Sequence, residues 1–183
     1  MHAGRRCLGH THAVLSPVGS CYSMKAKWFC SIGLLLFSWQ SIGASAGNSI
    51  AKEMLAAHNV YRTRVGSPPL AWSNDLAARA QQWATTLIDR GLYAPRRDGH
   101  FGENLFEISG GNANPSRVVS AWRSEEANYD HATNSCKARC GHYTQVIWRT
   151  TRLVGCGVAR NAKREVWVCD YDPHGNTIGE RPY

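Results

Sequence analysis

The sequence predicts a single disulfide-bonded domain of the α+β class. Apolar residues recur at helical spacing in the first half of the chain, and two apolar runs near its end are spaced as a β-hairpin. The second half also holds four cysteines, an even number typical of an exported domain with two disulfides. A chain of 183 residues has room for one such domain.

Residues 24–46 contain the three parts of a secretory signal peptide. Two lysines precede the apolar run 28–39, and the small residues Ala44-Ser45-Ala46 offer a cleavage site. The apolar run is short for a bilayer span, so a cleaved signal is favoured over an N-terminal membrane anchor. The mature domain would then comprise residues 47–183.

Residues 1–23 precede that signal and match no part of it. A misassigned start, with true initiation at Met24, is the simpler interpretation, and a genuine extended leader is the alternative. Residues 1–46 hold four of the 21 basic residues and none of the 13 acidic ones, so processing lowers the net charge from +8 to about +4. With no basic run and no nucleic-acid motif, DNA and RNA are not expected partners. We expect a monomer that is not an integral membrane protein after processing.

Three helices are predicted ahead of the hairpin. The first covers residues 49–65, and its inner face carries Ile50, Met54, His58, Tyr61 and Val65. We expect His58 to satisfy a buried hydrogen bond rather than to bind a ligand. The second helix begins near Asp75 and ends at Gly91, in the usual place of a C-terminal glycine. The third begins at Asn114-Pro115, and its apolar stripe comprises Val118, Trp122, Glu125 and Tyr129.

A short strand is predicted at residues 103–108, and the hairpin strands at 153–159 and 165–171. With the four-residue loop between the hairpin strands as the turn, Cys156 lies directly opposite Cys169, within the Cα separation that a disulfide requires. The two cysteines left to pair across a short loop are Cys136 and Cys140.

Short motifs with a characteristic order and spacing extend over residues 50–183. They are HNVYR at 58–62, PLAW at 69–72, GENL at 102–105, WRSE at 122–125, CGHYTQVIW at 140–148, GCG at 155–157, CDYDP at 169–173, GN at 175–176 and GERPY at 179–183. Together these segments resemble the CAP superfamily: the cysteine-rich secretory proteins, antigen 5 and the pathogenesis-related 1 proteins. The plant pathogenesis-related 1 branch and its microbial relatives are the most similar.

The resemblance implies a three-layer α-β-α sandwich with a central, largely antiparallel sheet. It also implies a secreted, extracellular protein, or a periplasmic one in a bacterium. Plant members carry six cysteines, and the two positions missing here, one of which corresponds to Asn161, are normally bonded to each other. The remaining pairs agree with the hairpin register.

The resemblance further implies a cleft with two histidines and two glutamates. Glu103, Glu125 and His142 carry over by motif, and His100 is the candidate for the fourth member. On a strand, positions 100 and 103 would face opposite sides, so a bend at Gly102 would be needed to bring both into the cleft. The residues support Glu125 separately, because a carboxylate on an apolar helix stripe needs a partner.

Two imidazoles and two carboxylates suit Zn²⁺, and they suit a metal-free hydrogen-bonded cluster equally well. We therefore expect no required cofactor, and zinc at this cleft only as a weak or occasional ligand.

The first functional interpretation is a non-enzymatic secreted binding module. The resemblance implies lipid or sterol binding, or an extracellular or envelope partner, with a role in defence, virulence or competition. The alternative is a metal-dependent extracellular hydrolase, protease-like, with Glu103 or Glu125 as general base. After removal of residues 1–46, the chain has no HExxH motif, no GxSxG elbow and no unpaired cysteine, which favours binding. No residue is assigned as catalytic, and a structural role in a wall or envelope is a third alternative.

Overall fold

The computed structural model describes residues 42–183, with side chains from Ser49 onward. The predicted leader and most of the predicted signal peptide lie outside the described residues. The helices are α1 (Ile42–Arg64), α2 (Asn74–Asp89), α3 (Pro115–Arg123), the 3-10 turn η1 (Ser124–Asn128) and α4 (Gly141–Ile147). The strands are β1 (Ala71–Trp72), β2 (Gly102–Ser109), β3 (Tyr129–Asp130), β4 (Ser135–Cys136), β5 (Leu153–Arg160) and β6 (Arg164–Asp172). Across residues 42–183, none of the helices combines the length and apolar character that a membrane span requires.

Local signals set the end of α2 and the start of α3 as predicted, and a cap not assigned from sequence, Ser73, begins α2. Ser73 caps α2 by accepting a 3.3 Å hydrogen bond from the backbone N–H of Leu76, and Gly91 just beyond the helix adopts a φ of 65°. Asn114 caps α3 in the same way at 2.8 Å, with a proline in the first turn.

The central sheet has the strand order β1-β5-β6-β2. β6 is antiparallel to both of its neighbours, and only the short β1 runs parallel to β5. The register places Cys156 opposite Cys169, and these residues form a disulfide with a Cα separation of 4.1 Å. The second predicted bridge, Cys136–Cys140, is also present.

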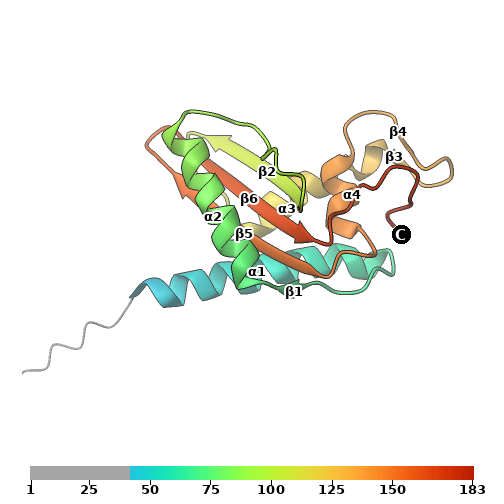
Figure 1. Ribbon diagram of the computed structural model, residues 1–183, viewed down its shortest axis with the longest axis horizontal. Coiled ribbons are helices and arrows are strands. Elements are labelled where there is room, and N and C mark those ends of the chain that lie inside the picture. Colours follow the sequence, from blue (N-terminus) through green and yellow to red (C-terminus); the bar gives the residue numbers. More distant parts are fainter. Residues whose placement is uncertain (1–41) are drawn as a thin grey trace, which may run out of the picture. The chain divides into compact units, whose positions relative to one another are not determined.

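Helices cover both faces of the sheet, with α2 on one side and α1 and α3 on the other (Figure 1). The predicted three-layer sandwich is confirmed. Two glycines of β5 allow the α2 backbone to approach closely. A Cβ atom at Gly155 would lie 2.2 Å from the nitrogen of Ala77, and one at Gly157 would lie 2.3 Å from the Cα of Gln81.

Two elements differ from the predictions. The third helix ends at Arg123, so Glu125 lies in η1 and Tyr129 in β3, although the apolar stripe indicated one continuous helix. α4 was not predicted, because residues 143–147 are all buried and its sequence lacks the one-sided apolar pattern of a surface helix.

Candidate functional site

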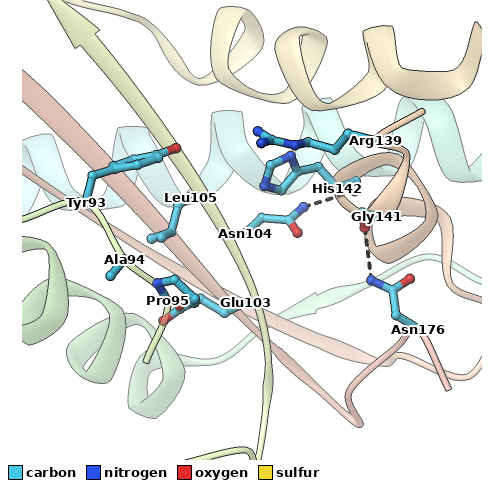
Figure 2. A pocket seen from close by; sticks show the side chains of 10 residues that line it. All are labelled: Tyr93, Ala94, Pro95, Glu103, Asn104, Leu105, Arg139, Gly141, His142 and Asn176. Atoms are coloured by element: carbon cyan, nitrogen blue, oxygen red, sulfur yellow. Dashed lines mark hydrogen bonds between the residues drawn. The ribbon is translucent and has the colours of Figure 1, made fainter. Parts of the chain in front are cut away.

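A cavity of about 380 Å³ opens beside β2, an edge strand of the sheet (Figure 2). Three consecutive residues of β2 contribute to its wall, together with the loop before β2, the start of α4 and the C-terminal segment. The lining residues are Tyr93, Ala94, Pro95, Glu103, Asn104, Leu105, Arg139, Gly141, His142 and Asn176. This volume is in the range of small-molecule sites.

Glu125 and His142 form a close pair beside the cavity. Glu125 Oε1 lies 2.8 Å from His142 Nδ1, and Oε2 accepts a 2.9 Å hydrogen bond from the backbone N–H of His142. The glutamate side chain is 14% exposed, whereas that of Glu126 is 43% exposed and pairs with Arg123. The 3-10 geometry of η1 therefore directs Glu125 inward, toward the first turn of α4.

A chain of buried neutral groups supports this pair. Asn104 Nδ2 donates to the backbone oxygen of His142 at 3.0 Å and to the hydroxyl oxygen of Tyr171 at 3.3 Å. His58 lies 2.8 Å from that hydroxyl through Nε2 and 2.8 Å from the carbonyl oxygen of Met54 through Nδ1. Since a carbonyl only accepts, Nδ1 carries the proton and Tyr171 donates to Nε2. Burial lowers the pKa of His58 to about 4, so this histidine is neutral and satisfies buried hydrogen bonds, as predicted.

Glu103 faces the other side of β2 from Asn104, because successive side chains of a strand alternate. Its register partner Asp170 lies 3.0 Å from the Nε atom of Arg79 in α2. Glu103 Oε1 accepts a 2.9 Å hydrogen bond from the backbone N–H of Arg96. Oε2 has no hydrogen-bond partner in the described chain and lies 3.9 Å from Arg96 Nε. Burial raises the pKa of Glu103 to about 7 and that of Asp170 to about 6.

The structure divides the four predicted cleft residues. His142 and Glu125 are paired, and Glu103 lines the same cavity but joins the charged groups beside α2. His100 is exposed in the loop before β2 and is not one of the residues that line the cavity. The reason is local: Gly102 begins β2 rather than bending the chain back toward α4.

The donors present do not form a closed zinc site. Within residues 42–183, no group of three or more His, Cys, Asp or Glu side chains lies close enough to hold a metal ion. Strand alternation keeps Glu103 apart from the Glu125–His142 pair, and Glu125 already engages His142 Nδ1.

Comparison with known families decides what kind of domain holds this cavity. The model of the cysteine-rich secretory protein family, CAP, matches residues 55–171. The chain belongs to the CAP family.

Relatives of this CAP domain match most of its length. Pathogenesis-related protein 1B of Nicotiana tabacum is 41% identical over 88% of this chain and 97% of that protein. Pathogenesis-related protein 1 of Arabidopsis thaliana is 39% identical over 72% of this chain and 81% of that protein. The resemblance to the pathogenesis-related 1 branch is therefore confirmed.

Solved structures show the same fold. Venom allergen-like protein 4 of Schistosoma mansoni superimposes with a TM-score of 0.60 at 27% identity, covering 73% of this chain and 92% of that one. The crystal structure of NaASP2 with Zn²⁺ has a TM-score of 0.62 at 21% identity, covering 74% of this chain and 85% of that one.

Several lining residues of the CAP domain were not assigned from sequence. Asn104 and Asn176 lie in the GENL and GN motifs, but no role was inferred for either. Strand alternation could have placed Asn104 opposite in direction to Glu103. Tyr93 and Arg139 lie in irregular segments, where no periodicity predicts the direction of a side chain.

Within residues 49–183, no histidine forms a hydrogen bond with a side chain that could act as a nucleophile. Their ring nitrogens contact carbonyl oxygens, the Tyr171 hydroxyl or Glu125, and none contacts a serine, threonine or cysteine side chain within residues 49–183. The four cysteines of this region are all in disulfides.

Proposed function

We propose that this CAP protein is a secreted, non-enzymatic binding module for a lipid or sterol, with a role in defence. One observation carries the proposal. The cavity beside β2 has an apolar wall made of Tyr93, Ala94, Pro95 and Leu105, and a few polar groups on its other sides. An apolar surface with a small number of polar contacts is the usual composition of a site for a small amphipathic ligand.

The defence role is supported by the relatives, which are named as pathogenesis-related proteins. Secretion is supported by the predicted signal peptide and by two disulfides in the described domain. Intact-mass analysis of exported protein should show a chain that begins at or near Gly47. Retention of residues 24–46 would contradict cleavage.

A cavity-filling variant tests the binding function. Ala94 is exposed on the apolar wall, so Ala94→Trp should occupy the cavity while leaving the core intact. We expect the wild type to bind a fluorescent sterol or lipid probe at micromolar concentration and Ala94→Trp to lose most of that binding. The matched control is Ala132→Trp, at an exposed loop position that does not line the cavity. Equal binding by both variants would place the ligand elsewhere.

Zinc binding, if measured, should be weak, because the donor set lacks a closed group of ligands. His142 and Glu103 both line the cavity, so they are the histidine and the carboxylate that an ion there could contact. Titration calorimetry should give a dissociation constant that is micromolar or weaker, and His142→Ala should abolish the signal without changing the binding of a neutral sterol. Steady peptide cleavage that both a chelator and His142→Ala eliminate would instead support a hydrolase.

A further inference from the structure

β2 lies at an edge of the four-stranded sheet, so only one of its sides is paired with β6. The Cα atoms of Cys156 and Cys169 lie 4.1 Å apart, the close spacing of an antiparallel pair that exchanges no backbone hydrogen bonds. Cys169 therefore directs its N–H and C=O groups to β2, where its register partner is Asn104. Because this direction alternates along a strand, the residues on either side of Asn104 direct their backbone groups away from the sheet.

Most of these outward groups have no partner in the described chain. Within residues 49–183, the backbone groups of Glu103, Leu105 and Glu107 form no hydrogen bond to a backbone outside the sheet. One of them is engaged by a side chain: Trp122 Nε1 donates to the Leu105 oxygen at 2.9 Å, in agreement with the direction inferred from the register. The remaining N–H and C=O groups form a ladder that a further strand can extend.

The edge of the sheet at β5 is protected. β1 pairs with Leu153 and Val154, and the Gln81 side chain covers Val158. Gln81 Nε2 donates to the Val158 oxygen at 2.9 Å, and the Val158 N–H donates to Gln81 Oε1 at 3.0 Å. Edge strands are ordinarily covered in some such way, so the uncovered edge of β2 points to a partner.

The cavity lies along this open edge and has walls on both sides of the strand. Leu105 lies between Tyr93 and Ala94 on one side (Figure 2). Asn104 points to the other side, where its Nδ2 atom donates to the backbone oxygen of His142. Since successive side chains of a strand alternate, a strand added here directs every second residue to the apolar wall and the others toward the start of α4.

The side toward α4 carries a cation, Arg139. This exposed residue lies inside the short loop that the Cys136–Cys140 disulfide closes, and its backbone oxygen accepts a 2.8 Å hydrogen bond from Asn128 Nδ2. Within residues 49–183, its guanidinium forms no ion pair. The charge is therefore presented from an anchored segment to whatever enters beside β2.

The neighbouring His142 supplies no second cation. Its Nδ1 atom donates to Glu125 Oε1 at 2.8 Å, which leaves Nε2 of the neutral ring as an acceptor. Glu125 Oε2 accepts from the backbone N–H of His142, so this carboxylate is already engaged. An acidic side chain that enters on this side is therefore bound by Arg139, through the two parallel hydrogen bonds of a guanidinium–carboxylate pair.

We propose that the open edge of β2 binds an extended peptide segment of a partner protein as an added strand. The segment alternates acidic and apolar residues: an acidic side chain pairs with Arg139, and its neighbours lie against Tyr93, Ala94 and Leu105. In such strand addition, main-chain hydrogen bonds supply affinity and the alternating side chains supply specificity. This inference goes beyond the proposed lipid-binding function and does not depend on it, although both ligands use the same apolar wall.

The dimensions of the cavity favour a single peptide segment over a second copy of this chain. The loop before β2 and the start of α4 flank the edge and leave a cavity of about 380 Å³. That volume is in the range of small-ligand sites, whereas the edge of a second folded sheet would bring its own covering helices with it.

The test measures binding of a capped peptide of eight residues, the length of β2, in which glutamate alternates with valine. Matched peptides replace each glutamate by lysine or by glutamine, or carry N-methyl groups at the valines or at the glutamates. We expect the lysine peptide to bind the mature protein about tenfold more weakly than the glutamate peptide, because it loses the pair with Arg139. At least one N-methylated peptide should lose a similar factor, because its backbone no longer donates to β2.

Arg139→Gln should weaken binding of the glutamate peptide about tenfold and leave binding of the glutamine peptide unchanged. The matched control is Arg117→Gln, which removes the same charge from an exposed position of α3 that does not line the cavity. Circular dichroism and unfolding curves would show that both variants are folded.

A second pair of variants tests the ladder. Glu107→Pro removes an outward N–H without breaking a hydrogen bond to β6, as proline in an edge strand permits. Glu107→Gln removes the same carboxylate and keeps the N–H, so it should bind the peptide about fivefold more tightly than Glu107→Pro. In the wild type, peptide binding should slow amide hydrogen exchange at Leu105 and Glu107 and change it little at Asn104, which is bonded to β6.

Several results would overturn the inference. Equal binding of the glutamate and lysine peptides would remove the acidic specificity. Full affinity of both N-methylated peptides, or unchanged exchange at Leu105, would remove the strand ladder. A protein that dimerises on its own, and that Glu107→Pro makes monomeric, would assign the edge to a second copy. Failure of every peptide to bind would end this proposal and leave the lipid test with Ala94→Trp unaffected, just as failure of lipid binding alone would leave this proposal standing.

Discussion

The two faces of the central sheet place polar groups in the interior in different ways. On the face covered by α1 and α3, the buried His58, Tyr171 and Asn104 are neutral and joined by hydrogen bonds. On the face covered by α2, Glu103 and Asp170 are carboxylates beside arginines, and Glu103 Oε2 has no hydrogen-bond partner in the described residues. The cavity lies at β2, where both faces contribute to its wall.

This difference explains why Glu103 is separated from the Glu125–His142 pair. The neutral groups His58, Tyr171 and Asn104 are joined by hydrogen bonds in one arrangement of donors and acceptors, so they hold His142 in a fixed position. A buried carboxylate with an unsatisfied oxygen is destabilised in its charged form, so it responds to pH. The first face therefore provides orientation, and the second provides a titratable group.

The largest loss of stability is expected from replacing Arg62, which is buried on the α1 side of the sheet. Its guanidinium donates to the carbonyl oxygens of Pro68, Val146, Trp148 and Thr151, at 2.7 to 3.0 Å. Arg62→Met leaves these acceptors unsatisfied and should lower the free energy of unfolding by about 3–5 kcal/mol. Urea denaturation measures this, with Arg64→Met as the control, because Arg64 is exposed and only stacks over Tyr61. Similar losses in both variants would show that this buried network is not the stabilising feature.

The next largest loss of stability is expected where α2 packs closely on the sheet. A Cβ atom at Gly155 would lie 2.2 Å from the backbone of Ala77, which a flexible side chain cannot relieve. Gly155→Ala should destabilise the domain by about 1–3 kcal/mol through overpacking. Gly111→Ala, where a Cβ atom would have no neighbour within 4 Å, should change thermal stability little. A neutral Gly155→Ala would mean that α2 can move away from the sheet at no cost.

A smaller change in stability is expected when either carboxylate of the site, Glu103 or Glu125, is replaced by glutamine. The pKa of Glu103 is raised from 4.5 to about 7, so the native state binds its proton more tightly than the unfolded state does. Stability contributed by this group is present below about pH 4.5 and lost as the pH rises through 7. Glu103→Gln should therefore be more stable than the wild type at pH 8 by about 1 kcal/mol, with the difference vanishing near pH 4.

Glu125→Gln is the matched comparison for that experiment. It replaces a carboxylate whose two oxygens both engage His142, and it should lower stability at pH 8 by about 1–2 kcal/mol. Unfolding midpoints measured from pH 4 to pH 8 distinguish the two variants, because at pH 8 Glu103→Gln should be more stable than the wild type and Glu125→Gln less stable. A stabilised Glu125→Gln, or a Glu103→Gln whose advantage grows as the pH falls, would contradict the division of roles.

The smallest change in stability is expected for the ion pair between Arg123, at the end of α3, and Glu126 in η1. Both side chains are more than 40% exposed, so solvent screens their attraction. Glu126→Gln should change the free energy of unfolding by about 0–0.5 kcal/mol, measured beside Glu125→Gln under the same conditions. A loss as large as that of Glu125→Gln would mean that η1 depends on both acids.

The sequence by itself determined the elements with strong local signals and the hairpin register. Gly91 and Asn114 mark helix ends through backbone groups close to them in the chain, so their effect does not depend on the rest of the fold. The pairing of Cys156 with Cys169 followed from the length of one turn, because a hairpin register is set locally. The order of the short motifs indicated the CAP family, whose model matches residues 55–171.

Only the tertiary structure decided which of the predicted site residues meet. Glu125 reaches His142 because the chain changes from α-helix to 3-10 turn at Ser124, and the apolar stripe is compatible with either geometry. Glu103 faces α2 because the register between β2 and β6 aligns it with Asp170, a pairing of residues 67 positions apart that no local pattern specifies. The cavity and the position of Arg139 depend on irregular segments whose path is set by contacts with distant elements, through the Cys136–Cys140 loop and the Trp83–Ala94 hydrogen bond.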